Sequence, residues 1–178
     1  VFWVGTAGDG LHTMDRKTGQ FERHTYDPSK PLDLSRPPLR NDAWLKANDK
    51  AWLRANDQVT FIIEDNIGSI WIGSMFAGIN RYDTGTKKIT HYEHSFGYPD
   101  SSSWNAFQSR DGELWISTQD NNLYRVDPFH KTIHSITTGD EAWNFKEDKQ
   151  GYLWVSTRGS GLFKFDQQLN LIQQFKHN

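Results

Sequence analysis

The stretch WIGSMFAGINRYD, residues 71–83, decides the fold because the chain repeats it. Related stretches surround three other tryptophans: FWVGTAGDGLHTMD at Trp3, LWISTQDNNLYRVD at Trp115 and LWVSTRGSGLFKFD at Trp154. In every copy an aliphatic residue follows the Trp by eight positions, an Asp follows it by twelve, and a Gly or Asn stands just before the aliphatic residue. Self-similarity of this kind is typical of repeat architectures, in which each copy is one supersecondary unit.

The spacing of the repeats indicates their size. The four tryptophans are separated by 68, 44 and 39 positions. The last two spacings match the roughly 40 to 50 residues of a four-stranded propeller blade, and the first is longer by about 25 residues. We therefore expect an insertion between the first two units, at about residues 36–56.

Each unit is predicted to contain four short strands. In residues 57–100, apolar and β-branched runs alternate with turn residues such as Asn, Gly and Asp. A single sheet of this kind cannot bury both faces, whereas radial stacking of several sheets does so and protects their edges. The pattern predicts an all-β chain, a β-propeller of four-stranded antiparallel blades with about four repeat units. We place the units at about residues 1–35, 57–100, 101–140 and 141–178, and expect the first to begin at its second strand.

Composition excludes several classes of function. Net charge is −2, so the chain has no electrostatic footprint for nucleic acid or an anionic membrane. It has no cysteine, which excludes thiolate chemistry, Cys-ligated zinc and disulfides. No apolar run approaches the roughly 18 residues of a membrane span. The chain opens on Val1, and we expect it to be a mature or excised piece of a larger propeller.

Two stretches carry a family resemblance. Residues 64–92, EDNIGSIWIGSMFAGINRYDTGTKKITHY, resemble the two-component regulator propeller repeat. Within residues 26–57, the pattern YDPSKPLDLS followed later by ND resembles the linker that joins blades in that family. The resemblance implies a seven-bladed propeller in the periplasmic or extracellular sensor portion of a bacterial hybrid two-component receptor, with glycan-derived ligands. The chain departs from that pattern in having about four units.

Specificity is expected where the repeats differ. In a propeller, the loops between the second and third strands share one face with the loops that connect consecutive blades. These loops contain Phe76, Asp120 and Arg158 at positions that the repeats do not share. Arg158 is a candidate to hold a carboxylate or sulfate bidentately. The alternative is an arginine that is simply solvated.

A second signal is the pair Trp-Asn near the start of the first strand. Trp104-Asn105 and Trp143-Asn144 stand eleven and ten positions before their blade tryptophans, where the second unit has Thr60-Phe61. An aromatic face beside an amide suits a sugar, because C–H groups stack on the ring and hydroxyls bond the amide. In the alternative interpretation these tryptophans fill gaps between blades.

The insertion contains a tandem, AWLKANDK followed by AWLRANDQ. Ala, Leu, Lys and Arg favour a helix, and Asp42 could cap its start. Such a helix would serve as a lid or partner contact. The alternative is a loop packed on the rim of the propeller.

Catalytic, metal-binding and cofactor-binding patterns are weak. His91 and His94 fall on opposite faces of a strand, and His130 and His134 would lie about 13 Å apart. We therefore predict no catalytic residues, no metal and no cofactor. The predicted function is a ligand-sensing propeller that binds an oligosaccharide or other small polar ligand. Its other expected partners are neighbouring propeller or receptor domains, and a second copy in a possible homodimer. The alternatives are a protein-interaction propeller and, less favoured, a lyase or hydrolase of the streptogramin-lyase type.

Overall fold

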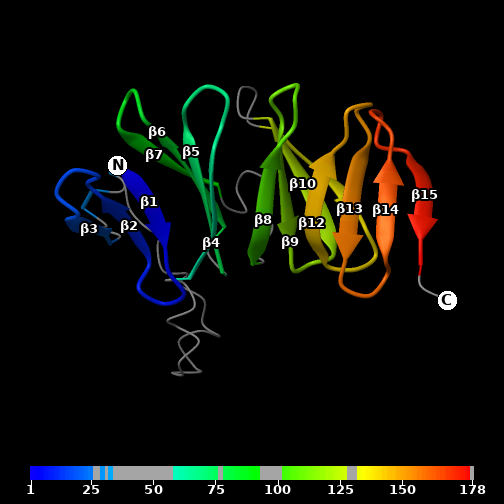
Figure 1. Cartoon of the computed structure of the whole chain (residues 1–178), viewed down its shortest axis with the longest axis horizontal. Helices are drawn as coiled ribbons and strands as arrows, with labels where there is room; N and C mark the ends of the chain where they lie inside the picture. The colour runs from blue at the N-terminus through cyan, green and yellow to red at the C-terminus, as the bar shows by residue number, and fades with distance from the viewer. Residues whose placement is uncertain are drawn as a thin grey trace. The chain divides into compact units, whose positions relative to one another are not determined.

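The computed structural model describes residues 1–25, 29–30, 32–33, 58–75, 78–92, 102–127 and 132–176. Within these ranges every regular element is a β-strand, and the strands form one three-stranded and three four-stranded antiparallel sheets (Figure 1). In each sheet the order of the strands follows the chain. The predicted all-β class and four-stranded blades are confirmed. The insertion at 36–56, with its tandem, lies outside the described residues.

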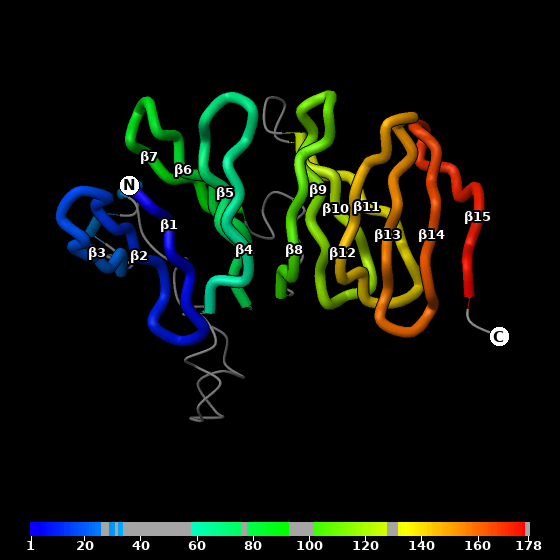
Figure 2. The backbone as a smooth tube through the Cα atoms, in the orientation of Figure 1, coloured from blue at the N-terminus to red at the C-terminus, as the bar shows by residue number. Residues whose placement is uncertain are grey.

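The chain divides into two compact units, Val1–Ser103 and Trp104–Asn178, which are treated separately below. The first unit holds a three-stranded sheet and a four-stranded one, and its smooth trace is drawn in Figure 2. Its strands are β1 (Phe2–Gly5), β2 (Leu11–Met14) and β3 (Phe21–His24), then β4 (Val59–Glu64), β5 (Ile70–Ser74), β6 (Ile79–Asp83) and β7 (Lys88–Tyr92).

The second unit holds two four-stranded sheets, with β8 beginning at the boundary between the units. The strands of its first sheet are β8 (Ser103–Gln108), β9 (Leu114–Thr118), β10 (Asn122–Asp127) and β11 (Thr132–Thr137). Those of its second sheet are β12 (Ala142–Glu147), β13 (Leu153–Thr157), β14 (Leu162–Phe165) and β15 (Leu171–Phe175).

The turn between the first and second strands is tied to the blade tryptophan. In the second repeat the Trp71 Nε1–H donates to Asp65 Oδ2 at 2.9 Å, and in the fourth the Trp154 Nε1–H donates to Asp148 Oδ2 at 2.8 Å. The same aspartates accept the backbone N–H of Gly68 and Gly151 through their carbonyl oxygens, which closes the expected β-turns. Each Asp therefore fixes both a turn and an indole.

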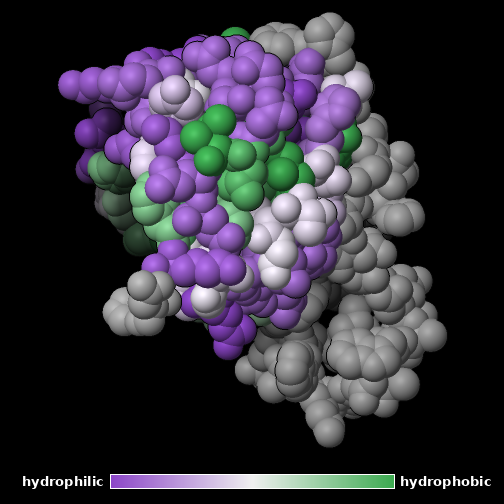
Figure 3. Space-filling view, turned by 90° about the vertical axis from the view of Figure 1, so that its right-hand side faces the viewer, coloured by the Kyte–Doolittle hydropathy of each residue, from purple (hydrophilic) through white to green (hydrophobic). Residues whose placement is uncertain are grey.

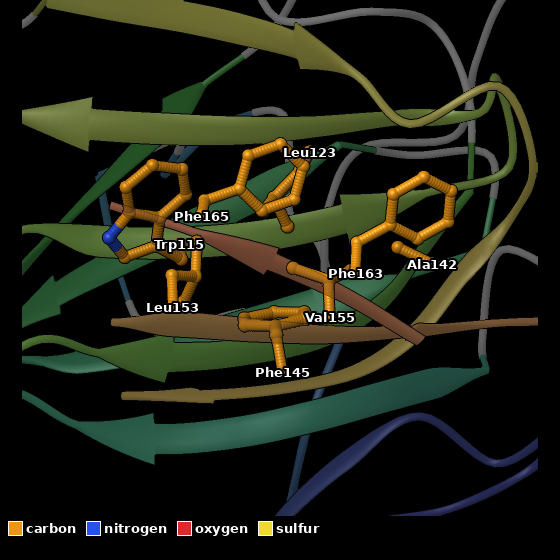
Figure 4. Packing of buried hydrophobic residues seen from close by; sticks show 8 residues of the cluster. All are labelled: Trp115, Leu123, Ala142, Phe145, Leu153, Val155, Phe163 and Phe165. Carbon is orange, nitrogen blue, oxygen red and sulfur yellow. The ribbon is translucent and has the colours of Figure 1, made fainter. Parts of the chain in front are cut away.

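The blade tryptophan of the third repeat is buried between the two sheets of the second unit. Trp115, from β9, is 4% exposed and belongs to a cluster with Phe145, Leu153 and Val155 of the following sheet (Figure 4). The corresponding Trp154 of β13 is only half-buried, and it stacks on Phe175 of β15 at 5.8 Å between ring centroids. The recurring Trp is thus a packing residue.

The first unit has its own core of buried side chains. Leu11 of β2 is fully buried there with Ile72 and Tyr82 of the next sheet, and Trp3 packs against this cluster. On the side of the molecule that carries β15, apolar side chains are exposed instead of buried. Figure 3 shows them as an apolar patch among polar residues. Leu171, Ile172 and Phe175 are exposed apolar residues of β15.

Candidate functional site

An irregularity in the first strand sets the direction of Trp143. Strand β12 pairs with β13 in regular antiparallel register except between Ala142 and Asn144, where the register shifts. A bulge of this kind re-aims the side chain at the extra residue. The Trp143 side chain is 59% exposed, so the interpretation that it fills a gap between blades is wrong for this residue.

Trp143 lines a pocket of about 540 Å³ within the second unit, together with Trp104, Gln119, Glu141 and Arg158. The two tryptophans come from the first strands β8 and β12, Gln119 and Arg158 from the loops between second and third strands, and Glu141 from the connection into β12. The structure thus joins three predicted residues, Trp104, Trp143 and Arg158. It also places the two expected kinds of loop at one pocket.

The Trp104 side chain differs from that of Trp143 in its burial. Trp104 is half-buried, and its Nε1 is covered from solvent and has no hydrogen-bond partner among the described residues. An N–H that is buried and unpaired costs free energy. Trp104 therefore contributes to the wall of the pocket as a half-buried side chain, and its N–H is covered.

Arg158 is paired rather than isolated. Its Nη1 lies 3.3 Å from Glu141 Oε2, and its backbone N–H donates to the Glu141 carbonyl oxygen at 2.9 Å. The arginine side chain is 66% exposed, whereas the Glu141 side chain is 18% exposed. The charge of Arg158 is therefore already balanced by a more buried carboxylate, which the sequence-based hypothesis of a lone guanidinium did not include.

The two asparagines are engaged within the protein. Asn105 Nδ2 donates to the Trp143 carbonyl oxygen at 3.4 Å and to Asn144 Oδ1 at 3.3 Å. The Oδ1 atoms of Asn105 and Asn144 accept the backbone N–H of Ala106 and Phe145, respectively, at 2.9 Å. Their amides tie β8 to β12 and hold the strand edges beside the tryptophans.

Asp120 is turned into its own loop and does not line the pocket. Its Oδ2 accepts the Tyr124 hydroxyl at 2.6 Å, and its Oδ1 accepts the Thr118 hydroxyl and the Asn122 N–H. Burial acts to raise the pKa of Asp120, but the hydrogen bonds from Thr118, Tyr124 and Asn122 outweigh it and lower that pKa. Phe76, the remaining predicted residue, lies outside the described residues.

Sequence reasoning missed Glu141, Gln119 and the neighbouring Asp140. Asp140 Oδ2 accepts the backbone N–H groups of Gly159 and Ser160 at 2.6 and 2.7 Å, so it fixes the loop that carries Arg158. These bonds, that of Gly159 foremost, lower the pKa of Asp140. A signal for Glu141 existed, because the other repeats place Gln58 and Ser102 thirteen positions before their tryptophans.

A second cavity, of about 600 Å³, lies at other turns of the same unit. Two ion pairs stand in its lining: Arg110 Nη2 to Glu147 Oε1 at 2.8 Å, and Arg125 Nη1 to Glu113 Oε2 at 3.4 Å. Burial raises the pKa of Glu113. None of the predicted site residues lines this cavity.

The described part of the chain contains no group of three or more His, Cys, Asp or Glu side chains placed to hold a metal ion. His94 and His130 fall outside that part. Among the described residues no helix is long and apolar enough to cross a membrane.

Comparison with known families bears on the fourth repeat. Residues 138–159 match the model of the two-component regulator propeller. The match is confined to the fourth repeat, where the segment from the end of β11 to the loop after β13 is similar to this family. The matched segment includes Glu141, Trp143 and Arg158 of the pocket. None of the curated proteins matches the chain in sequence.

Solved structures share the fold of this chain. The extracellular domain of the hybrid two-component system BT4673 from B. thetaiotaomicron has 22% identity and a TM-score of 0.69, over 99% of this chain and 22% of that one. That of BT3049 from the same organism has 19% identity and a TM-score of 0.60, over 99% and 27%. Virginiamycin B lyase from Staphylococcus aureus has 13% identity and a TM-score of 0.67, over 98% and 51%. The propeller fold is confirmed, and the chain spans only part of each of these proteins.

Proposed function

We propose that the chain is part of the ligand-sensing propeller of a bacterial two-component sensor, located in the periplasm or outside the cell. Its ligand would be a carbohydrate or a related small polar molecule, and it would signal without catalysis. The observation that carries this proposal is the pocket in which the exposed Trp143 and the half-buried Trp104 stand beside Gln119, Glu141 and Arg158. The match to the propeller repeat over residues 138–159 supports the sensor role.

The chemistry of the lining suits a sugar. An indole offers a large rigid face for C–H groups, and it loses little conformational entropy because only two side-chain torsions are fixed. The amide of Gln119 and the Arg158–Glu141 pair supply both donors and acceptors for hydroxyl groups. A few polar groups that converge on an aromatic wall are typical of small-molecule sites.

The two walls of the pocket belong to consecutive sheets, which suggests how binding is transmitted. A ligand that touches Trp104 of β8 and Trp143 of β12 favours the arrangement in which both indoles contact it. Its differential affinity for two arrangements would then shift their populations. Neighbouring receptor domains, or a second copy of the receptor, would receive that shift.

The test is a thermal-shift screen of this chain against an oligosaccharide library, followed by titration of each hit with the variants Trp104→Ala and Trp143→Ala. At a ligand concentration 100 times Kd, binding stabilises the folded state by about 2.7 kcal/mol. Each variant should lower the affinity at least tenfold. Phe21→Ala is the matched control, because Phe21 is also an exposed aromatic residue but lies in the first unit.

Two results would contradict the proposal. The first is the absence of a thermal shift with every oligosaccharide, combined with the capture of a specific protein partner, which would favour the interaction propeller. The second is unchanged affinity in both tryptophan variants, which would place the ligand elsewhere.

A further inference from the structure

In the described part of the chain, the charged side chains that line the pocket are one carboxylate and one guanidinium. Among the residues that line it, Glu141 and Arg158 carry opposite charges 3.3 Å apart. Next to them the Asp140 carboxylate binds the loop amides of Gly159 and Ser160. Among the described residues that line the pocket, the cation Arg158 thus already faces a carboxylate.

We infer that Glu141, acting with Arg158, selects a neutral saccharide over an acidic one at this pocket. The inference rests on the proposed function, since it concerns which sugars the sensing pocket takes. It replaces the expectation that Arg158 binds a carboxylate or sulfate of the ligand.

The geometry supplies the reason. Glu141 uses Oε2 for Arg158, while Oε1 makes no hydrogen bond within the part of the chain that the structure describes. Arg158 has five N–H donors on its guanidinium, and in the described structure only Nη1 is engaged. Adjacent sugar hydroxyls fit this pair, since one can donate to Glu141 while the next accepts from Arg158.

An acidic sugar would instead meet electrostatic repulsion at this pair. Its carboxylate or sulfate would have to compete with Glu141 for the guanidinium and to approach the Glu141 carboxylate, which is of like charge. Like charges within about 4 to 6 Å disfavour each other, and more strongly where the site is shielded from water. Glu141 is the more buried partner of the pair, so solvent screens its charge less than that of Arg158.

The test is calorimetric titration of neutral disaccharides and of the uronic-acid disaccharides of the same linkage, with the unaltered chain and with Glu141→Gln. The substitution keeps the shape of the side chain, and the backbone bond from Arg158 N–H to the Glu141 carbonyl does not depend on it. The unaltered chain should prefer the neutral sugar by at least about tenfold. Glu141→Gln should lower the affinity for the neutral sugar roughly tenfold, as expected for a lost hydrogen bond to a charged group. It should also reduce or reverse the preference for the neutral over the acidic sugar.

A matched control is Glu113→Gln, which breaks an ion pair of similar length, to Arg125 at 3.4 Å, in the other cavity. It should leave both affinities unchanged. Glu141→Asp, which keeps the charge, should keep the preference even if Glu141→Gln fails to fold.

The outcomes separate the two proposals. Tighter binding of uronic acids by the unaltered chain, or an unchanged preference in Glu141→Gln, would overturn the role of Glu141 while leaving sugar sensing in place. No binding of any disaccharide or longer oligosaccharide would overturn the proposed function itself, and the inference with it.

Discussion

Gly161 is a position where a single methyl group should be damaging. Its φ is +88°, and a Cβ built there would lie 2.1 Å from the Phe175 carbonyl oxygen, where ordinary contact begins at 3.4 Å. Left-handed backbone costs a residue with a Cβ about 1–2 kcal/mol. Displacing the end of β15 also weakens the stack of Phe175 on Trp154, a pair of the kind worth about 0.5–1.5 kcal/mol. Gly161→Ala should therefore lower the free energy of unfolding by about 1.5–3.5 kcal/mol.

Gly139→Ala is the control, because Gly139 has a similar φ of +73° but no heavy atom within 4 Å of its Cβ position. It should lose only the backbone contribution of about 1–2 kcal/mol. Urea unfolding followed by tryptophan fluorescence measures both variants against the unaltered chain. If Gly161→Ala lies within about 0.5 kcal/mol of Gly139→Ala, contact with Phe175 does not constrain this turn, and the reasoning fails.

Two further predictions concern stability. Trp115→Ala should lower the free energy of unfolding by about 3–5 kcal/mol because the side chain is 4% exposed, whereas Trp143→Ala, with an exposed side chain, should lower it by under about 1 kcal/mol. Equal losses in urea unfolding would show that both are core residues. Hydrogen bonds lower the pKa of several aspartates, from the Trp154 indole foremost for Asp148 and from turn residues for the others. The stability that these aspartates contribute is complete above the unfolded pKa and is lost as the pH falls through the folded pKa. These aspartates are Asp15, Asp83, Asp148 and Asp166. The melting temperature should consequently begin to fall only below about pH 4, and a steep fall between about pH 7 and 5 would assign acid sensitivity to other groups.

The repeats made most of the fold predictable from sequence. Trp71, Trp115 and Trp154 recur at the same distance from their flanking strands, and each lies in the second strand of a four-stranded sheet. Residues that recur in every copy are those that pack in the same way in each repeat. A repeated pattern therefore predicts strands and turns well. The turn at Asp65 was expected from the Gly three positions later, but the bond from the Trp71 indole to the Asp65 side chain was not, because it joins a turn residue to a side chain of the next strand.

The site was less predictable because it depends on what the side chains meet. Trp143 and Arg158 were identified from differences between repeats, and both line the pocket. Asn105 was expected to meet a sugar hydroxyl, yet its amide crosses to the neighbouring strand. Glu141 was missed, since its importance comes from the 3.3 Å approach to a residue seventeen positions away.

One position in the first strand explains why the pocket forms where it does. Eleven residues before the blade tryptophan, the second repeat has Thr60, whereas the third and fourth have Trp104 and Trp143. In β4 the strand register shifts between Val59 and Phe61, and in β12 it shifts at the matching position, around Trp143. Both sheets therefore have the same backbone irregularity there. With Thr60 the hydroxyl is buried, while with Trp143 the indole reaches solvent. The same kind of irregularity therefore accompanies a buried hydroxyl at Thr60 and an exposed indole at Trp143. A pocket with two indole walls then requires two consecutive repeats with Trp at this position, a condition that the third and fourth repeats meet.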